Sequence, residues 1–166
     1  MILEGEKVNL RRIMESDYAR IINWNKNELL TYYIGNRLPK THSECHLRYK
    51  TGNKLLNKIL AIEDKQGDLI GEVELDHIQW RDRQGEIFIY IGDKSLWNKG
   101  YGTEALELFL NYLIREKEFK YIYLRVYENN KRAIKCYEKC GFKKRGVLRF
   151  NKNSTHKNLV LMELLP

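Results

Sequence analysis

The sequence contains few cysteines and no long apolar run. No stretch approaches the roughly 18 apolar residues that span a membrane, and no secretory leader is recognisable, so we expect a cytoplasmic protein. Cys136 and Cys140 stand four apart on a predicted helix, without zinc-site spacing, and Cys45 is remote. We therefore expect buried thiols and no metal. With no linker or internal repeat, residues 1–166 are expected to form a single domain.

The sequence does carry a large positive charge. Its formal net charge of +8 makes a basic nucleic-acid-binding module one hypothesis. However, Lys and Arg are spread over both halves, and no RNA-binding or helix-turn-helix signature appears. A polyanionic cofactor would give the positive field a simpler use. The basic residues that flank the glycine loop described next are Lys94, Lys99, Lys131, Arg132 and Lys135.

The segment from Glu86 to Leu113 predicts a strand, a glycine loop and a helix. Residues 87–91 are an unbroken β-branched and aromatic run, typical of a strand covered on both faces. After Gly100 and Gly102, apolar residues recur at the spacing of an amphipathic helix. The first N–H groups of such a helix lack intrahelical partners, and glycine lets a phosphate approach them closely. The segment therefore predicts an anion-binding loop.

Two better-known phosphate motifs do not fit this loop. Residues 100–105 match the dinucleotide fingerprint G-x-G-x-x-G/A, but residues 92–99 separate them from the preceding strand. Too few residues follow Glu128 to build the remaining units of that fold. A Walker loop would require Gly-Lys-Ser/Thr, which is not present at the right spacing.

The following segment makes the interpretation specific. Residues 121–127 predict a second strand, and the next residues fit N-x-x-A-x-x-x-Y-x-K-x-G-F, from Asn130 to Phe142. Together with W-N-K-G-Y-G-T at residues 97–103, this order resembles the GNAT superfamily of acyl-CoA-dependent N-acyltransferases. The resemblance is nearest to the ribosomal-protein N-acetyltransferases and the spermidine acetyltransferases. It implies an α/β (α+β) fold with a mixed, mostly antiparallel central sheet of about seven strands, flanked by helices.

The resemblance implies that acetyl-CoA is the cofactor. The family's phosphate loop falls on residues 97–102, with Trp97 where the family has Gln or Arg, so Trp97 could instead pack against the strand end. The backbone of residues 89–91 is expected to pair with the pantetheine arm, where antiparallel neighbours splay apart. The residues expected at the cofactor are Ile89, Tyr90, Ile91, Trp97, Asn98, Lys99, Gly100, Tyr101, Gly102, Thr103, Asn130, Ala133 and Tyr137.

Direct acetyl transfer needs a base for the amine proton and an acid for the departing thiolate. The resemblance places Tyr137 at the thiolate end of the cofactor, where a phenol is protonated at neutral pH and can act as the acid. The alternative is a core tyrosine. Glu86, at the start of the central strand, is the expected base, with a water chain as the alternative.

The acceptor is expected to be a primary amine. A protein N-terminus is the favoured acceptor, and a polyamine or another small amine is the alternative. Glu72, Glu74 and Asp76 share one face of a strand and could form an acidic wall for a cation, or a solvated sheet face. Tyr32 and Tyr33 could line an acceptor pocket or cover the core. The expected partners are acetyl-CoA and this amine, and the chain could also form a homodimer. We expect no binding to a membrane or to nucleic acid.

The remaining segments follow ordinary local signals. Ser16 predicts the N-cap of a helix to residue 25, and the capping box Thr41–Glu44 predicts a helix over residues 42–50. Residues 26–39 show no clear periodicity. The other strands are expected at residues 7–12, within 55–63, at 69–78, at 142–150 and at 158–164, with an exposed loop over residues 151–158.

Overall fold

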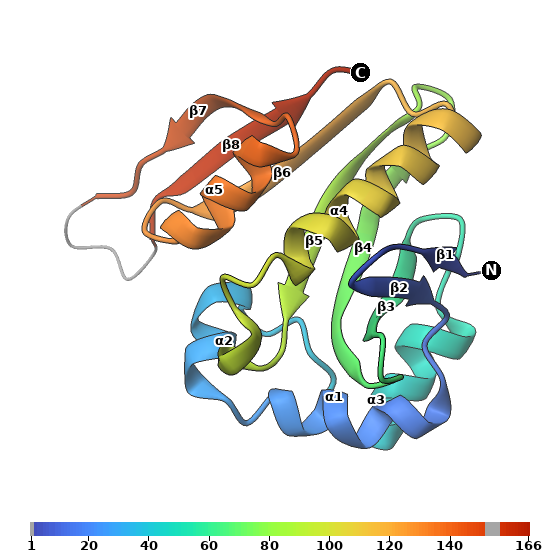
Figure 1. Cartoon of the computed structure of the whole chain (residues 1–166). Helices are drawn as coiled ribbons and strands as arrows, with labels where there is room; N and C mark the ends of the chain where they lie inside the picture. Colours follow the sequence, from blue (N-terminus) through green and yellow to red (C-terminus); the bar gives the residue numbers. More distant parts are fainter. Residues whose placement is uncertain (1, 152–156) are drawn as a thin grey trace.

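An eight-stranded sheet crosses the molecule in the computed structural model, which describes residues 2–151 and 157–166 (Figure 1). Its order is β1-β2-β3-β4-β5-β6-β8-β7, and only the β5–β6 pair is parallel. The predicted mixed, mostly antiparallel fold is confirmed, with the short β1 as an additional strand. The strands are β1 (Leu3–Glu4), β2 (Val8–Arg11), β3 (Lys58–Asp64), β4 (Leu69–Gln79), β5 (Gln84–Ile91), β6 (Tyr121–Tyr127), β7 (Lys143–Leu148) and β8 (Leu159–Leu164).

Helices cover both faces of the sheet and enclose two apolar cores. Helices α4 and α5 pack on one face, and α1 and α2 contribute to the smaller core on the other. A 3-10 turn (Glu15–Asp17) precedes α1, a π-helical turn (His46–Thr51) extends α3, and another (Tyr112–Glu116) extends α4. The α-helices are α1 (Tyr18–Trp24), α2 (Glu28–Ile34), α3 (His42–Cys45), α4 (Tyr101–Asn111) and α5 (Lys131–Lys139).

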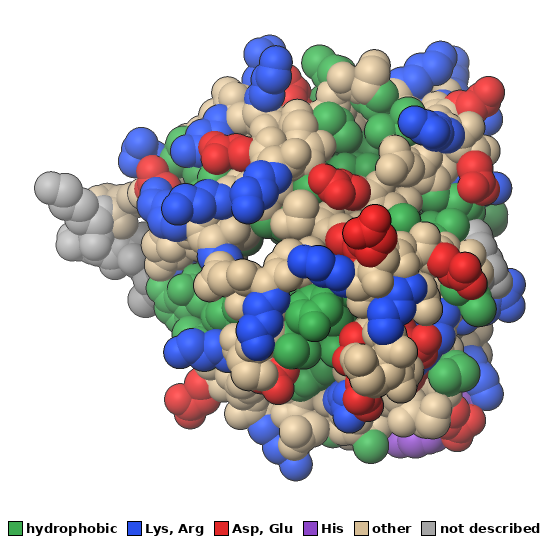
Figure 2. Space-filling model, in the orientation of Figure 1, with side chains coloured by type: hydrophobic (Ala, Val, Ile, Leu, Met, Phe, Trp, Pro, Cys, Tyr) green, Lys and Arg blue, Asp and Glu red, His purple; other side chains and the backbone are tan. Residues whose placement is uncertain are grey.

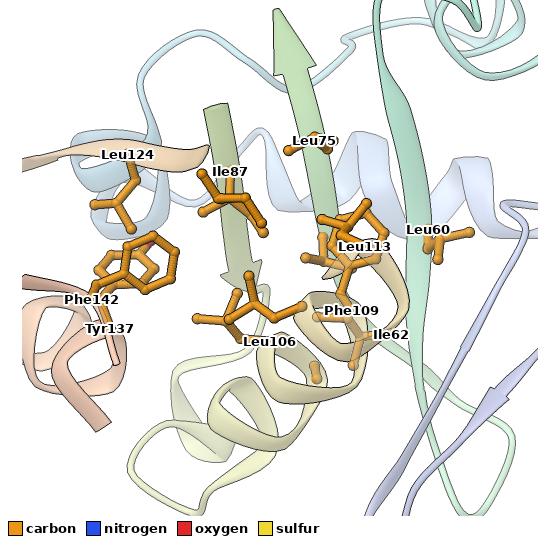
Figure 3. Packing of buried hydrophobic residues seen from close by; sticks show 14 of the residues in the cluster. Leu60, Ile62, Leu75, Ile87, Leu106, Phe109, Leu113, Leu124, Tyr137 and Phe142 are labelled. Carbon is orange, nitrogen blue, oxygen red and sulfur yellow. The ribbon is translucent and has the colours of Figure 1, made fainter. Parts of the chain in front are cut away.

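The larger core is built on the apolar stripe of α4. Leu106, Phe109 and Leu113 are at most 1% exposed and point toward the strands in Figure 3. Tyr137 of α5 and Phe142 lie together beneath β6 and join the same core. Burial of these side chains fixes the direction of α4 relative to β5, and therefore the position of the glycine loop between them.

One expectation about the first hundred residues was wrong. Ser16 is not an N-cap, because the Asp17 carboxylate accepts the Met14 N–H at 2.7 Å and also binds the Arg11 guanidinium. In the stretch without clear periodicity, α2 nevertheless forms, with the Asn27 side chain accepting the Leu30 N–H at its N-terminus.

The feature that shapes the site is the separation of β5 from β6. These strands pair only where residues 84–86 meet residues 121–123. Beyond Glu86, β5 continues to Ile91 with β4 on one side and, within the described residues, no strand on the other. The strands that splay are therefore a parallel pair, which corrects the expected antiparallel one. The Gly92 N–H bonds to Ile70 of β4, so by alternation the N–H and C=O groups of Ile89 point into the opening.

Candidate functional site between β5 and β6

Two adjoining cavities occupy the opening between β5 and β6. One, of about 230 Å³, is bounded by α2, β5, β6 and α5, and the other, of about 200 Å³, by the N-terminal end of α4 and by α5. They share Ile91, Gly102, Arg132 and Cys136, so they form one groove. Figure 2 shows a hollow in this face of the molecule with Lys and Arg side chains around it.

The groove brings together nearly every residue predicted for the cofactor. All of them line one of the two cavities except Lys99. The carbonyl oxygen of Lys99 instead accepts a hydrogen bond from Lys7 Nζ at 3.1 Å. Among the predicted basic residues, Arg132 and Lys135 line the groove, whereas Lys94 and Lys131 do not.

The N-terminus of α4 presents backbone donors to the groove. Gly100 is the N-cap residue with a φ of 86°, and no side chain caps the helix there. The first N–H groups of the helix, from Tyr101 to Thr103, therefore have no intrahelical acceptor. A Cβ at Gly102 would meet only Ile91 Cγ1, at 3.7 Å, so the space beside these donors is open. Donors, positive helix end and open space together fit a phosphate group.

Trp97 packs against the end of β5, which was the alternative expected for it. Its indole N–H donates to the Ile91 carbonyl oxygen at 2.9 Å, and the Arg132 guanidinium lies 3.7 Å from its ring centre. The side chain thus closes the end of β5 and holds Arg132 in the groove through a cation–π contact. Trp97 therefore does not replace the side-chain donor that the family places here.

Glu104 anchors the glycine end of α4 to the N-terminal hairpin. Its carboxylate accepts backbone N–H groups of Glu6, Lys7 and Val8 at 2.9, 2.7 and 2.8 Å. Lys7 in turn bonds the loop carbonyl of Lys99. The loop is consequently held from both sides, which keeps its free N–H groups aimed into the groove.

Tyr137 belongs to the core and to the groove at the same time. Its side chain is 5% exposed, packs edge-on against Phe142 at 5.9 Å, and lines the larger cavity. Burial raises the pKa of Tyr137 well above its ordinary value, so the phenol keeps its proton at neutral pH. Asn130 caps the same helix by accepting the Ala133 N–H at 3.3 Å. The two alternatives for Tyr137 therefore do not exclude each other.

The cysteines are less buried than expected. Only Cys45 is fully buried, whereas Cys136 and Cys140 are partly exposed. Cys136 lines the groove with its sulfur 3.4 Å from Thr103 Oγ1. Hydrogen bonds from Cys140 and Thr103 lower the pKa of the Cys136 thiol.

The predicted acidic residues share one face of the sheet but do not line the groove. The register places Glu72, Glu74 and Asp76 opposite Tyr90, Phe88 and Glu86. Of the four carboxylates, only Glu86 reaches the cavity lining. Glu72 and Glu74 are 1% and 2% exposed, so the solvated-face alternative is wrong.

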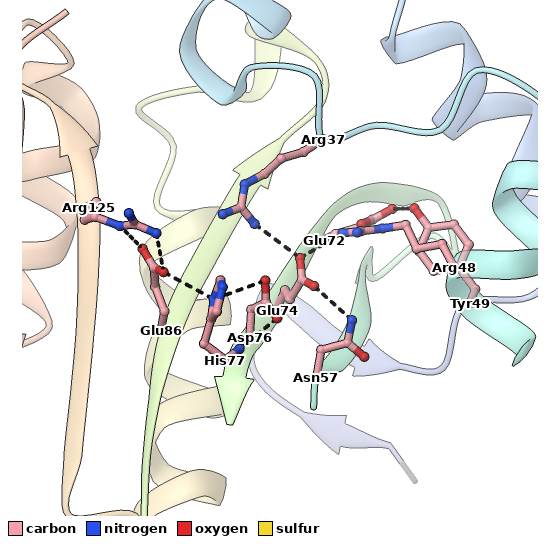
Figure 4. A network of polar contacts seen from close by, with 10 residues as sticks. All are labelled: Arg37, Arg48, Tyr49, Asn57, Glu72, Glu74, Asp76, His77, Glu86 and Arg125. Atoms are coloured by element: carbon pink, nitrogen blue, oxygen red, sulfur yellow. Dashed lines mark hydrogen bonds and ion pairs between the residues drawn. The ribbon is translucent and has the colours of Figure 1, made fainter. Parts of the chain in front are cut away.

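Arginines and a tyrosine neutralise or bind these buried carboxylates (Figure 4). Glu74 accepts from Arg48 at 2.7 Å and lies 3.6 Å from Arg37. Glu86 is held by both Arg125 Nε and Nη2, at 2.7 and 2.8 Å. The arginine side chains therefore neutralise most of the negative charge on this face of the sheet.

Glu72 differs from Glu74 and Glu86 because no arginine among the described residues bonds it directly. Tyr49 donates its hydroxyl to Glu72 at 2.6 Å. Burial, opposed in part by Arg48, raises the pKa of Glu72 to about 7.

His77 is a residue that the sequence gave no reason to choose. It follows Asp76 at an irregularity in the β4–β5 register and adopts a φ of 50°. Its Nδ1 lies 3.4 Å from both Asp76 Oδ2 and Glu86 Oε2, and its side chain is 58% exposed (Figure 4). His77 therefore connects the buried Glu86 with solvent. Arg125 could have been noticed, as the charged residue within the apolar run of β6.

The paired tyrosines of α2 have different positions. Tyr33 lines the larger cavity and contacts Trp97 edge-on at 6.3 Å. Tyr32 does not line it; its hydroxyl accepts from Asn129, and Lys157 lies over its ring. Of the predicted acceptor residues, only Tyr33 thus faces the cavity. The predicted loop over residues 151–158 lies mostly outside the described residues.

Comparison with known proteins gives a consistent match over most of the chain. A family model described as an acetyltransferase (GNAT) domain matches residues 7–143. The spermidine N(1)-acetyltransferase of Vibrio cholerae is 29% identical over 145 residues, covering 87% of this chain and 83% of that protein. The spermine/spermidine N(1)-acetyltransferase of Bacillus subtilis is 27% identical, covering 87% and 93%. An uncharacterized protein of Methanocaldococcus jannaschii is 30% identical, but the chain spans only 29% of its length.

Solved structures extend this similarity to the fold. The crystal structure of the Vibrio cholerae spermidine N-acetyltransferase with CoA and spermine has a TM-score of 0.85 at 27% identity, covering 97% of this chain and 96% of that one. A dodecameric structure of the spermidine N-acetyltransferase from the same organism has a TM-score of 0.78, covering 97% and 95%. In the part of this chain that is described, no helix is long and apolar enough to span a membrane.

A Gly102→Val substitution tests whether the open space at α4 receives a phosphate group. Because a Cβ fits beside Ile91, the fold should tolerate the change, while the larger side chain covers the free N–H groups. We expect CoA affinity, measured by calorimetry, to fall at least about 100-fold, or close to 3 kcal/mol. Gly146→Val, at an exposed position of β7 with no neighbour within 4 Å, is the matched control. Unchanged affinity in a variant with a native circular dichroism spectrum would contradict this assignment.

A Glu72→Gln substitution tests the buried carboxyl through pH. The folded pKa of about 7 exceeds the ordinary 4.5, so this group contributes stability below about pH 4.5, and the contribution is lost as pH rises to 7. Neutral glutamine avoids that loss, so relative to wild type the variant should gain on the order of 3 kcal/mol of unfolding free energy between pH 4.5 and 8. Urea unfolding at both pH values measures it, with exposed Glu107→Gln as the control. If the unfolding free energies of the variant and the wild type differed by the same amount at both pH values, the raised pKa of Glu72 would be refuted.

Proposed function

This chain belongs to the GNAT acetyltransferase family, and we propose that its acceptor is a polyamine. It is an acetyl-CoA-dependent N-acetyltransferase, and the distant alternative of a non-enzymatic nucleic-acid-binding module is not supported. The observation that carries the acceptor proposal is the likeness, over nearly the full length of both chains, to an enzyme crystallised with CoA and spermine. The favoured expectation of a protein N-terminus has less support than this alternative.

The groove provides a place for each part of the cofactor. The free N–H groups at the start of α4, together with Arg132 and Lys135, would hold phosphates, and the open backbone of Ile89 would hold the amide-rich arm. When bound, acetyl-CoA supplies an acetyl group activated as a thioester. The fit rests on the space beside Gly102 and on the N–H groups of residues 101–103, which have no acceptor in the part of the chain that the structure describes.

Glu86 and His77 are proposed to remove the proton of the acceptor. An alkyl ammonium has a pKa near 10, so the amine must lose a proton before it can attack a carbonyl carbon. Glu86 lines the cavity, and His77, 3.4 Å behind it, is more than half exposed. An imidazole has one ring nitrogen that can accept a proton while the other donates one, which suits His77 to pass a proton to solvent. Arg125 fixes both oxygens of Glu86 in place.

Tyr137 is proposed to supply a proton to the leaving sulfur. The buried phenol retains its proton at neutral pH and lies across the cavity lining from β5. A phenol can therefore hydrogen-bond to a thiolate and donate to it during transfer. The same burial that makes Tyr137 part of the core keeps the acid protonated.

The sheet face beside the groove carries a small excess of negative charge, which weakly favours a cationic acceptor. The shared face holds the carboxylates of Glu72, Glu74, Asp76 and Glu86 against the guanidinium groups of Arg37, Arg48 and Arg125. With all four ionised, the face has one excess negative charge. Asp76 has no arginine partner within residues 2–151 and 157–166, and it neighbours Glu86 in the register. We assign Asp76 to a second amino group of the acceptor, which a polyamine has and a simple amine lacks.

Assembly is a further part of the proposal. The related enzyme of Vibrio cholerae has been solved as a dodecamer, which supports an oligomer larger than the expected homodimer.

The acceptor is tested by comparing amines in one assay. Purified enzyme, acetyl-CoA and either spermidine, spermine or short peptides with free N-termini are mixed, and release of the CoA thiol is followed. We expect kcat/KM for spermidine to exceed that for every peptide at least about 100-fold, because a peptide lacks the second ammonium group for Asp76. Faster turnover of a peptide would restore the protein N-terminus as the acceptor.

The role of Tyr137 is tested by Tyr137→Phe, which keeps the ring but removes the proton. We expect kcat with a good acceptor to fall roughly 100-fold while the affinity for acetyl-CoA changes little. Tyr121→Phe, whose hydroxyl bonds Glu163 away from the groove, should leave kcat near wild type. A variant with a lower melting temperature but normal turnover per folded molecule would show that Tyr137 is only a core residue.

A further inference from the structure

A third cavity lies on the other side of the buried carboxylates, away from the groove. It has a volume of about 440 Å³, larger than either part of the groove, and is formed by the end of β2, the π-helical turn after α3, β3 and the residue after β4. Pockets of this size take small molecules rather than extended chains. Its charged and aromatic lining includes Arg12, Arg48, Lys50, Lys54, Lys58 and Trp80.

The charge of this cavity is of one sign. Five lysines and arginines line it, and none of the aspartates and glutamates in the described part of the chain does. Lys50 has a single, exposed partner in Glu15 at 3.4 Å. Arg12 and Lys54 have no carboxylate partner among residues 2–151 and 157–166, whereas Lys58 Nζ lies 4.9 Å from the ring centre of Tyr112. The usual fate of a surface lysine is solvation, but five cations around one concave site, two of them without a carboxylate or ring partner, produce a field that favours an anion.

Arg48 connects this cavity to the acceptor side. Its Nη2 donates to Glu74 at 2.7 Å, while its buried Nε has no hydrogen-bond partner in the described structure. The same oxygen of Glu74 lies 3.6 Å from Arg37, which lines the larger part of the groove (Figure 4). A negative ligand beside Arg48 would compete with Glu74 for it and leave more of the Glu74 charge facing Arg37 and the acceptor.

We propose that this cavity is a second binding site, for a small polyanion of the phosphate class, and that its occupation strengthens binding of a cationic acceptor through Arg48 and Glu74. The anion site stands independently of the acceptor, whereas the coupling rests on the proposed function. Reciprocity requires the acceptor to strengthen anion binding by the same factor.

Binding is tested by calorimetry with sodium pyrophosphate on the intact enzyme. CoA is titrated first and kept saturating, so that the groove is filled and cannot take the probe. We expect pyrophosphate to bind, and Arg12→Gln/Lys54→Gln to weaken it at least about tenfold, because two charge-assisted contacts are lost. Lys143→Gln/Lys144→Gln, on β7 at the far end of the sheet, removes the same charge and should preserve affinity.

Two results would overturn the site: no binding of pyrophosphate with CoA bound, or equal weakening in both double variants, which indicates only long-range attraction. Failure of CoA itself to bind would instead overturn the proposed function. Both variants lie outside the groove, so basal turnover should remain normal.

The coupling is tested with spermidine at a fixed pH. Pyrophosphate should lower the KM for spermidine by about fivefold in wild type and not in Arg12→Gln/Lys54→Gln. Any association of pyrophosphate with spermidine in solution affects both enzymes equally, so the difference reports the site. The same change in KM in both enzymes would overturn the coupling.

Discussion

The separation of one pair of parallel strands is the constraint on which the site depends. A strand inside a sheet normally satisfies its backbone groups on both sides, and β5 does so only as far as Glu86. Beyond Glu86, β5 still pairs with β4 but no longer pairs with β6. The apolar core beneath β5 nevertheless remains continuous. The exposed edge, the free helix N-terminus and the buried Tyr137 all face the space that results. A ligand that supplies both hydrogen-bonding groups and phosphates would complete this incomplete edge.

Packing remote from the groove maintains that opening. The stripe of α4 fixes the helix on the sheet, while Glu104 ties its first turn to the backbone of the N-terminal hairpin. Trp97 then closes the end of β5 by bonding the Ile91 carbonyl. These contacts hold the anion-binding loop before any ligand arrives, which reduces the ordering that binding must otherwise supply.

The burial of several carboxylates is the least favourable feature of the fold in free energy. Removing charges from water is unfavourable unless they are paired with good geometry, and replacing such pairs with apolar residues is often neutral or stabilising. Glu74 and Glu86 are nevertheless retained with arginine partners, and Glu72 with a tyrosine. They lie between the groove and the basic cavity, so the proposed binding of an amine and of an anion would give a functional reason for this cost. A chain of alternating charges can carry the effect of a ligand on one side to the other.

The sequence by itself determined the local elements and most of the residues that line the groove between β5 and β6. The run at residues 87–91, the glycines before α4 and the Asn130 cap are short-range signals, and the groove follows because one strand, one loop and the next helix are consecutive in the chain. Only the tertiary structure decided how the strands pair and which groups bind the carboxylates. Arg48 and Glu74 are 26 residues apart, and Arg125 and Glu86 are 39 apart. Such contacts depend on sheet register and on the bulge that turns His77 toward Glu86, and neither is encoded in local periodicity.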